Sequence, residues 1–256
     1  MAMPVQERTF ENAKVCIFDS RDAMGKAAAG HVVRLINDIL KGKQSVSIIF
    51  AAAPSQNEFL AHLSSSGNVD WSRVEGFHMD EYIGLPETSD QFFSLFLQKH
   101  LFSKVRMNKV HLMNAHAQDT GKECDRYASL LHAYPVDIAC LGIGENGHIA
   151  FNDPPFADFH DPKLVKVVEL DAMDRQQQVN DGCFPTIEDV PSHAYTLTIP
   201  ALLSATYLSC VVPSERKAKA VFNSLKGEIS TLVPASILRT HSHIEMFLDT
   251  ASASLL

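Results

Sequence analysis

The segment VDIACLGIGENGHIAFNDP, residues 136–154, decides the fold of this chain. Its first part, residues 136–144, is a continuous apolar run that ends in closely spaced glycines, which is typical of a buried strand followed by a tight turn. Three polar side chains, Asn146, His148 and Asp153, follow at once. Because ligands bind at the carboxyl ends of strands in open α/β sheets, the segment predicts a functional loop at the end of a central strand.

Strand and helix signals alternate along the rest of the chain. The apolar runs that predict strands are residues 46–53, 74–80, 136–144, 164–170, 194–199, 207–213 and 243–249. The amphipathic runs that predict helices are residues 22–43, 56–65, 91–102, 119–134 and 215–227. Strands separated by helices form βαβ units, so we expect an α/β fold with a mainly parallel sheet covered on both faces. On this prediction, 45 residues precede the first strand.

Length and composition limit the class of protein. A chain of 256 residues with 46% hydrophobic and 20% charged residues fits one large globular domain, which we expect to span residues 1–256. The formal net charge of -8 argues against a nucleic-acid or anionic-membrane partner. No apolar run approaches the length of a membrane span. The five cysteines form no CxxC pair, so we expect a reduced, cytoplasmic protein without a disulfide framework or a structural zinc site.

A second polar group follows another predicted strand. In GFHMDEYIGL, residues 76–85, the adjacent carboxylates Asp80 and Glu81 end an apolar run. Burying a carboxylate without a partner is costly, so this position needs an explanation. Two interpretations stay open from the local sequence: Asp80 is a general base in a cleft, or the two side chains cap the next turn.

The glycines of the opening segment allow two interpretations. Gly142, Gly144 and Gly147 have the GxGxxG spacing of a dinucleotide-binding loop. However, no N-terminal βαβ unit surrounds them, and no acidic residue ends a strand about 20 residues later, so we expect no nucleotide cofactor. His148, flanked by polar residues, is better interpreted as an imidazole whose tautomer a neighbour fixes. A histidine packed in a turn is the alternative.

Positively charged candidates for an anion site lie in two later segments. Lys217 and Lys219 fall near the start of a predicted helix, and Arg175 lies in DRQQQ. A lysine just inside a strand-to-helix turn can complete an anion site, although a solvated helix face is the alternative for both lysines. No cluster of cysteines, histidines and carboxylates has the spacing of metal ligands, so we expect no metal.

Together, FHMDEYIGL (residues 77–85) and LGIGENGHIAFNDP (residues 141–154) resemble the two signature motifs of the glucosamine-6-phosphate deaminase/isomerase family. Their order and separation fit the family, and the resemblance spans most of the chain. It implies a Rossmann-like three-layer α/β/α sandwich. It also implies the conversion of an amino-sugar phosphate and water to a ketose phosphate and ammonia, without a redox cofactor. Members range from monomers to hexamers, which leaves a homo-oligomer open.

The resemblance also assigns roles to residues of this chain. Asp80 corresponds to the base that moves a proton between C2 and C1, and His148 to the histidine that opens the sugar ring. Asn146 and Asp153 would hold this histidine; many members have Asp and Glu, respectively, at these two positions. The residues that the resemblance places at the substrate are Glu81, Tyr82, Gly144, Gly147, Ser55, Lys217, which matches a lysine that contacts the sugar phosphate, and Arg175.

The phosphate site departs most from the family pattern. The usual Gly- and Thr-rich turn is replaced by AAAPSQNEF, residues 51–59, in which Ser55 and the following amides can hold an anion. A family arginine falls near Asn180, and Arg175 or Arg239 is the expected substitute. This departure predicts either a rebuilt phosphate site or a substrate with a different distal group.

Two other functions fit parts of the pattern. A 6-phosphogluconolactonase-type hydrolase has a related fold and second motif, but its motifs usually contain DER and GHTAS, where this chain has MDEY and GHIAFN. A catalytically silent, sugar-binding regulatory domain would have a similar fold. Such domains are normally joined to a DNA-reading helix, and no such helix is recognisable before residue 46.

Overall fold

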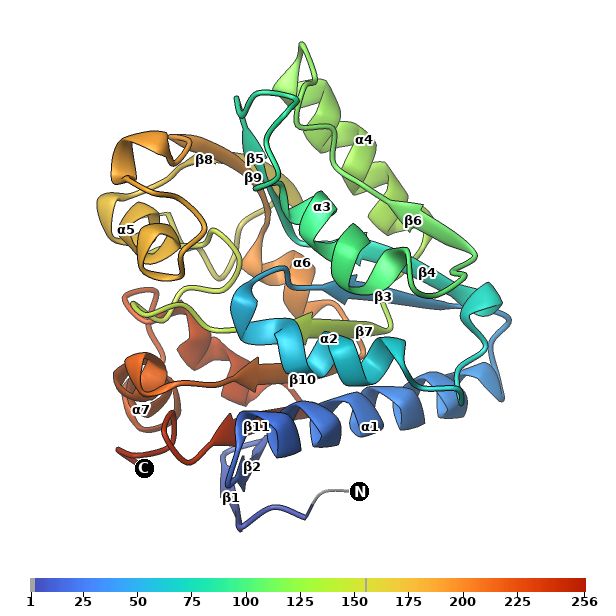
Figure 1. The fold of residues 1–256 in the computed structure, drawn as a ribbon, viewed down its shortest axis with the longest axis vertical. Coiled ribbons are helices and arrows are strands. Elements are labelled where there is room, and N and C mark those ends of the chain that lie inside the picture. The colour runs from blue at the N-terminus through green and yellow to red at the C-terminus, as the bar shows by residue number, and fades with distance from the viewer. Residues whose placement is uncertain (1–2, 155) are drawn as a thin grey trace.

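The strand signals form one large sheet and one small sheet in the computed structural model, which describes residues 3–154 and 156–256 (Figure 1). The strand order of the large sheet in these residues is β1-β2-β11-β10-β7-β3-β4-β6. In that order the strands are Gln6–Phe10, Ala13–Phe18, Ile244–Asp249, Tyr207–Val212, Ile138–Leu141, Val46–Phe50, Val74–His78 and Lys109–His111. The β1–β2 hairpin is antiparallel, and all other neighbouring strands are parallel.

Helices cover both faces of this sheet because successive strand residues point to opposite sides. Phe50 and Cys140 belong to one apolar cluster, whereas Ile49 and Leu141 belong to another. The first cluster includes residues of α1 (Arg21–Leu40), α2 (Asn57–Ser64) and α3 (Phe93–Leu97). The second includes residues of α4 (Thr120–Ala133), α6 (Ile199–Leu203) and α7 (Ala218–Lys226). The continuous apolar runs of the central strands therefore reflect burial on both faces.

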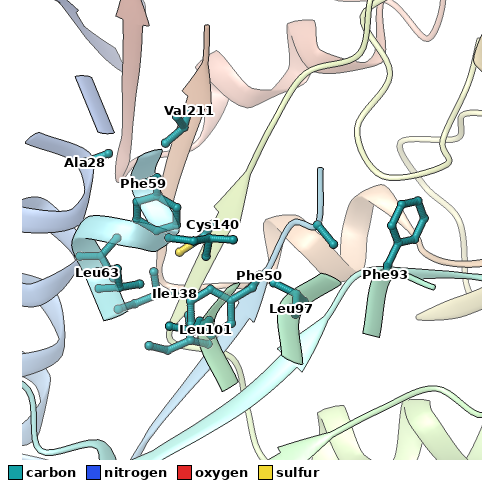
Figure 2. Packing of buried hydrophobic residues seen from close by; sticks show 14 of the residues in the cluster. Ala28, Phe50, Phe59, Leu63, Phe93, Leu97, Leu101, Ile138, Cys140 and Val211 are labelled. Atoms are coloured by element: carbon teal, nitrogen blue, oxygen red, sulfur yellow. The ribbon is translucent and has the colours of Figure 1, made fainter. Parts of the chain in front are cut away.

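Figure 2 shows part of the first cluster, with Phe59 and Leu63 of α2 packed near Ile138 and Cys140 of β7. Short helical turns connect several elements: η1 (Pro54–Gln56), η2 (Trp71–Arg73), η3 (Gln98–Phe102), η4 (Ile187–Asp189), η5 (Glu215–Lys217) and η6 (Pro234–Thr240). No helix in the described ranges has both the length and the apolar character needed to cross a bilayer.

A small antiparallel sheet continues directly from the large one. Its order is β5-β9-β8, with strands Asp80–Ile83, His193–Leu197 and Val165–Glu169. Only Met79 separates β5 from the end of β4. Helix α5 (Ala172–Asn180) follows β8, and Figure 1 shows both on the same side of the molecule. Asp80 is therefore located where the chain leaves one sheet and enters the other.

The strand order predicts the position of a ligand site. After β3 the chain continues outward to β4 and β6, but β7 returns to the other side of β3 and leads to β10 and β11. Neighbours β3 and β7 therefore mark the point where the strand order reverses. Ligands of open α/β sheets bind in the crevice at such a point, beyond the carboxyl ends of the strands.

The predicted three-layer sandwich with a mainly parallel sheet is confirmed. The predicted first strand is wrong, because β1 and β2 precede residue 46 and the run at residues 46–53 is β3, which ends at Phe50. Edge strand β1, QERTF, is short and polar, with mostly exposed residues, so it lacks the apolar signal of a central strand. The Ser20 side chain caps α1 by accepting a hydrogen bond from the Ala23 backbone N–H.

Close packing of α1 on α2 gives a prediction about stability. A Cβ on Gly25 would lie 2.6 Å from Glu58 Cβ and 2.7 Å from the Glu58 backbone carbon. We expect Gly25→Ala to lower the free energy of unfolding by about 1–3 kcal/mol, because overpacking forces the helices apart. Urea denaturation measures this change.

Gly42→Ala is the matched control, since no atom lies within 4 Å of a Cβ built at Gly42. We expect its unfolding free energy to stay within about 0.5 kcal/mol of the wild-type value. Equal losses in the two variants would show that the α1–α2 contact is not the cause.

Candidate active site

A pocket with about 860 Å³ of open space lies at the β3/β7 reversal point. Loops from four neighbouring strands contribute to its lining. Ser55 follows β3, Asp80 follows β4, His148 follows β7 and Lys217 follows β10. Residues from four separate segments thus meet at one edge of the sheet, as parallel strands require.

The loop after β7 fixes His148 through two polar neighbours. His148 Nδ1 lies 3.0 Å from Asp153 Oδ1, and Asp153 is 1% exposed. Asn146 Nδ2 donates a hydrogen bond of 2.7 Å to the same Asp153 oxygen, and Asn146 Oδ1 accepts one of 2.9 Å from the His148 backbone N–H. Because Nδ1 faces the carboxylate, Nε2 is the ring nitrogen that can exchange a proton with a ligand.

The glycines of this loop are needed because a Cβ atom at Gly144 or Gly147 would collide with a neighbouring side chain. A Cβ on Gly144 would collide with the His148 imidazole, so Gly144, which lines the pocket, makes room for that ring. Gly147 has a φ of +89°, and a Cβ there would lie 2.8 Å from Val233 Cγ1. Gly147, which was predicted to contact the substrate, lies outside the pocket lining.

Asp80 is buried to 8% exposure at the rim between the two sheets and lines the pocket. Its strand β5 pairs with β9, where Asp80 faces Thr196. Next to it, the Leu197 N–H donates a hydrogen bond of 2.7 Å to the Met79 carbonyl oxygen. The backbone of Asp80 is therefore held by the small sheet, whereas its side chain borders the pocket.

Glu81 and Tyr82 face different surroundings. Tyr82 lines the pocket and stacks on Phe93, with 4.6 Å between ring centroids. Glu81 is fully buried outside the lining, and its carboxylate accepts hydrogen bonds from the N–H groups of Tyr82, Phe93 and Ser94. Burial raises the pKa of Glu81 above its ordinary value, although these hydrogen bonds oppose the shift. Glu81 thus orients the start of α3, and the structure places it outside the pocket lining where the sequence predicted a substrate contact.

The two arginines that were predicted to bind the phosphate, Arg175 and Arg239, have other partners in the structure. The Arg175 guanidinium donates to the Ile187 carbonyl, and the Arg239 guanidinium donates to Ser224, Gly227 and Glu11. Neither arginine belongs to the pocket lining, so the pocket does not bring together the two arginines that the sequence suggested as substitutes. Lys217 does line it, and it contributes the one Lys or Arg side chain of the described lining.

The Ser55 hydroxyl also belongs to the pocket lining. It accepts a hydrogen bond of 3.3 Å from Gln56 Nε2, and it caps neither η1 nor α2. The Ser55 hydroxyl therefore lies at the pocket without capping a helix.

Several lining residues were not predicted as site residues. Gln177 and Gln178 of α5 line the pocket, and Gln177 Oε1 accepts a hydrogen bond of 2.7 Å from the Glu145 backbone N–H. Phe92, Phe93 and Phe96 form an aromatic side of the same pocket. The glutamines lie in a polar run of the sequence and the phenylalanines in an aromatic run. Such a run does not indicate which of its side chains face a pocket, so the sequence did not identify these residues. Within the described residues, no cluster of three or more His, Cys, Asp or Glu is placed to hold a metal ion.

His78, the last residue of β4, lies fully buried two positions before Asp80. Its Nε2 accepts a hydrogen bond of 2.8 Å from the Met113 backbone N–H. The Tyr127 hydroxyl accepts a hydrogen bond of 3.1 Å from the His78 N–H and donates one of 2.9 Å to the His78 carbonyl. Burial lowers the pKa of His78 to about 4, so the imidazole is neutral at pH 7.

Comparisons with known proteins agree with this geometry. The family model described as glucosamine-6-phosphate isomerases/6-phosphogluconolactonase matches residues 19–247. A glucosamine-6-phosphate deaminase of Bacillus cereus (strain B4264) is 36% identical over 229 residues, which are 90% of this chain and 84% of that protein.

Solved structures show the same fold. A monomeric glucosamine-6-phosphate deaminase has a TM-score of 0.85 at 28% identity, over 94% of this chain and 99% of that one. A 6-phosphogluconolactonase of Thermotoga maritima has a TM-score of 0.76 at 19% identity, over 93% of this chain and 99% of that one. At this lower identity, the likeness to the lactonase concerns the fold alone.

The buried neutral His78 gives a prediction about acid stability. Its pKa falls from an ordinary 6.5 to about 4 in the folded chain. Between these values the unfolded chain binds a proton that the folded chain does not, so the contribution is complete above pH 6.5 and is lost as pH falls toward 4. We expect His78 to account for a loss of about 3 kcal/mol of unfolding free energy over this range.

Urea denaturation at several pH values measures this loss. His78→Gln does not titrate, so we expect a flatter dependence on pH than in the wild type. His160→Gln, at an exposed position, is the control and should keep the wild-type slope. An unchanged slope in His78→Gln would assign the acid sensitivity to other groups.

Proposed function

The chain belongs to the family of glucosamine-6-phosphate isomerases and 6-phosphogluconolactonases, and from this we propose that it is an amino-sugar-phosphate deaminase/isomerase. It converts glucosamine-6-phosphate or an epimer, with water, to a ketose 6-phosphate and ammonia. The observation that carries the proposal is the meeting of Asp80 with the His148–Asp153 pair in one pocket. The 36% identity to a deaminase over most of the chain supports the same reaction.

His148 opens the sugar ring in this proposal. Its Nε2 takes the proton of the anomeric hydroxyl and returns a proton to the ring oxygen, which gives the open-chain aldehyde. Asp153, 3.0 Å from Nδ1, stabilises the imidazolium that forms in between. Asn146 keeps that carboxylate in place through its hydrogen bond to Asp153 Oδ1.

Asp80 then moves the proton that changes aldose to ketose. The carboxylate removes the proton from C2, which the neighbouring C1 carbonyl acidifies, while O1 gains a proton from the substrate's C2 ammonium group, and an enol-amine forms. The same proton returns to C1, so that C1 is reduced and C2 oxidised within one molecule, and C2 becomes an imine. Water adds to the imine carbon, and ammonia leaves. This internal redox change requires no redox cofactor.

Lys217 and Ser55 bind the distal phosphate in the proposal. Both line the pocket, and Lys217 supplies a positive charge that a phosphate group can pair with. Tyr82 and Gly144 border the sugar. We extend the proposal to a single catalytic domain over residues 1–256. We also place the enzyme in the cytoplasm, where its five unpaired cysteines stay reduced.

The direct test is product formation. Purified protein is incubated with glucosamine-6-phosphate and, separately, with galactosamine-6-phosphate and 6-phosphogluconolactone. We expect ammonia and ketose 6-phosphate in equal amounts from an amino sugar. Hydrolysis of the lactone alone would favour the lactonase alternative, and binding of the sugar phosphate without any product would favour the regulatory domain.

Asp80→Asn tests the assignment of the base. The amide cannot accept the C2 proton, so we expect kcat for ammonia release to fall by about 10²–10⁴-fold. Tritium or deuterium exchange at C2 should be lost in parallel. Asp90→Asn is the control, because Asp90 also lines the pocket but has no role in the proposed proton transfer. A wild-type rate in Asp80→Asn would show that another group is the base.

Lys217→Met tests the phosphate contact. Loss of one charge-assisted hydrogen bond should raise KM for the phosphorylated substrate by about 10–100-fold. Lys219→Met, two positions later and exposed, is the matched control and should leave KM unchanged. An equal effect in both variants would indicate a general electrostatic contribution of the helix instead of a contact by Lys217.

A further inference from the structure

Gln56 is buried at the pocket, but the proposed chemistry does not use it. It ends the short turn η1, directly after Ser55, and it is 1% exposed. Both residues belong to the pocket lining. They lie in the segment AAAPSQNEF, residues 51–59, which replaces the Gly- and Thr-rich phosphate turn of the family. A buried amide side chain at this point therefore requires a physical explanation.

The hydrogen bonds of the Gln56 side chain define which end of the amide is the donor. One amide atom lies 3.2 Å from the Val211 backbone carbonyl oxygen, which can only accept a hydrogen bond. This atom is therefore the nitrogen, Nε2. The same Nε2 lies 3.3 Å from Ser55 Oγ and donates its second proton there. Ser55 Oγ is thus the acceptor in its contact with Gln56.

This contact determines what the Ser55 hydroxyl offers to a ligand. Within residues 3–154 and 156–256 it is the single hydrogen bond of the Ser55 side chain, so the hydroxyl proton has no acceptor there. A hydroxyl that accepts one hydrogen bond still has its proton to donate, and accepting makes it a stronger donor. The Lys217 ammonium group, in the same lining, also offers donors alone. A phosphate oxygen, which accepts, pairs with both.

The Gln56 side chain also joins two strands that are not neighbours. Strand β7 lies between β3 and β10 in the sheet (Figure 1). Gln56 follows β3, whereas Val211 belongs to β10, so the side chain passes over the carboxyl end of β7. Gly142, the first residue after β7, leaves room for it, because a Cβ there would lie 3.0 Å from Gln56 Nε2. The amide that crosses above Gly142 thus gives this glycine a physical reason.

We propose that Gln56 is a positioning residue for the distal phosphate: its amide fixes Ser55 to the end of β10 and leaves the Ser55 hydroxyl as a donor toward the phosphate. The inference rests on the proposed function, in which Ser55 and Lys217 bind that group. Ser55 lies in the loop after β3, and the amide ties this loop to the strand that leads to Lys217. The site then favours a distal group that only accepts hydrogen bonds, such as an ionised phosphate, over a hydroxyl or an ammonium group.

The other end of the amide argues against a role in stability alone. Gln56 Oε1 is buried and has no hydrogen-bond partner in the part of the chain that the structure describes. An unpaired buried amide oxygen lowers the stability of the fold. Methionine has nearly the same length and no such oxygen, so Gln56→Met removes this cost together with the two donated hydrogen bonds. We therefore expect Tm to change little while phosphate binding weakens.

The test is a double-mutant cycle with two readouts: the Kd of inorganic phosphate, from chemical shifts of ¹⁵N-labelled protein, and KM for glucosamine-6-phosphate. We expect Ser55→Ala to raise both by about 10-fold, since a hydrogen bond to a charged group is lost. Gln56→Met should raise both by about 3–10-fold, with kcat within about 3-fold of wild type. In the Ser55→Ala background, Gln56→Met should add less than about 2-fold, because the hydroxyl that it positions is gone.

Gln98→Met, at an exposed position of η3 outside the lining, is the matched control and should keep the wild-type Kd and KM. A wild type that binds no phosphate, or a wild-type Kd in Gln56→Met, overturns the inference. Effects that multiply in the double variant, or that follow a fall in Tm, overturn it as well. If the wild type releases no ammonia from any amino-sugar phosphate, the proposed function fails, whereas the cycle on inorganic phosphate still decides the role of Gln56.

Discussion

The position of β7 between β3 and β10 is the constraint on which the site depends. Parallel strands end at one edge, so this order brings the loops after β3, β7 and β10 together, with the loop after β4 beside them. The central strands of this sheet are buried on both faces. In β3, for example, the successive residues Ile49 and Phe50 point into opposite apolar clusters. A rigid double-sided core can hold loops at fixed separations, and the proposed proton transfers require such fixed separations.

Burial of carboxylates is the second constraint, because each buried carboxylate needs specific partners. Glu81 has three backbone N–H donors and organises the start of α3. Asp153 has the Asn146 amide and the His148 ring within hydrogen-bonding distance and organises the catalytic loop. Asp80, in contrast, borders the pocket. Three acidic residues in two motifs thus lie in different surroundings, with partners that differ in each case.

The sequence predicted the central architecture and the pocket loops, because long apolar strands and closely spaced glycines leave strong local signals. Asp80, His148, Ser55 and Lys217 were expected at the site, and all four line the pocket. The failures concern properties that depend on distant partners. The roles of Arg175 and Arg239 depend on which carbonyls their guanidinium groups reach. Edge strand β1 lacks the apolar pattern that makes a central strand recognisable. Nothing in the local pattern showed that Gln177 faces the pocket.

The structure also explains why Asn146 and Asp153 belong together. Asn146 must donate to Asp153 Oδ1 and accept from the His148 N–H, and an amide can do both. An ionised Asp at position 146 would accept from the same N–H but place a second negative charge against Asp153, at the 2.7 Å separation seen here. Asp153 is therefore the carboxylate that lies against the His148 ring, 3.0 Å from Nδ1. In the proposed mechanism, this carboxylate supplies the negative charge that stabilises an imidazolium at His148.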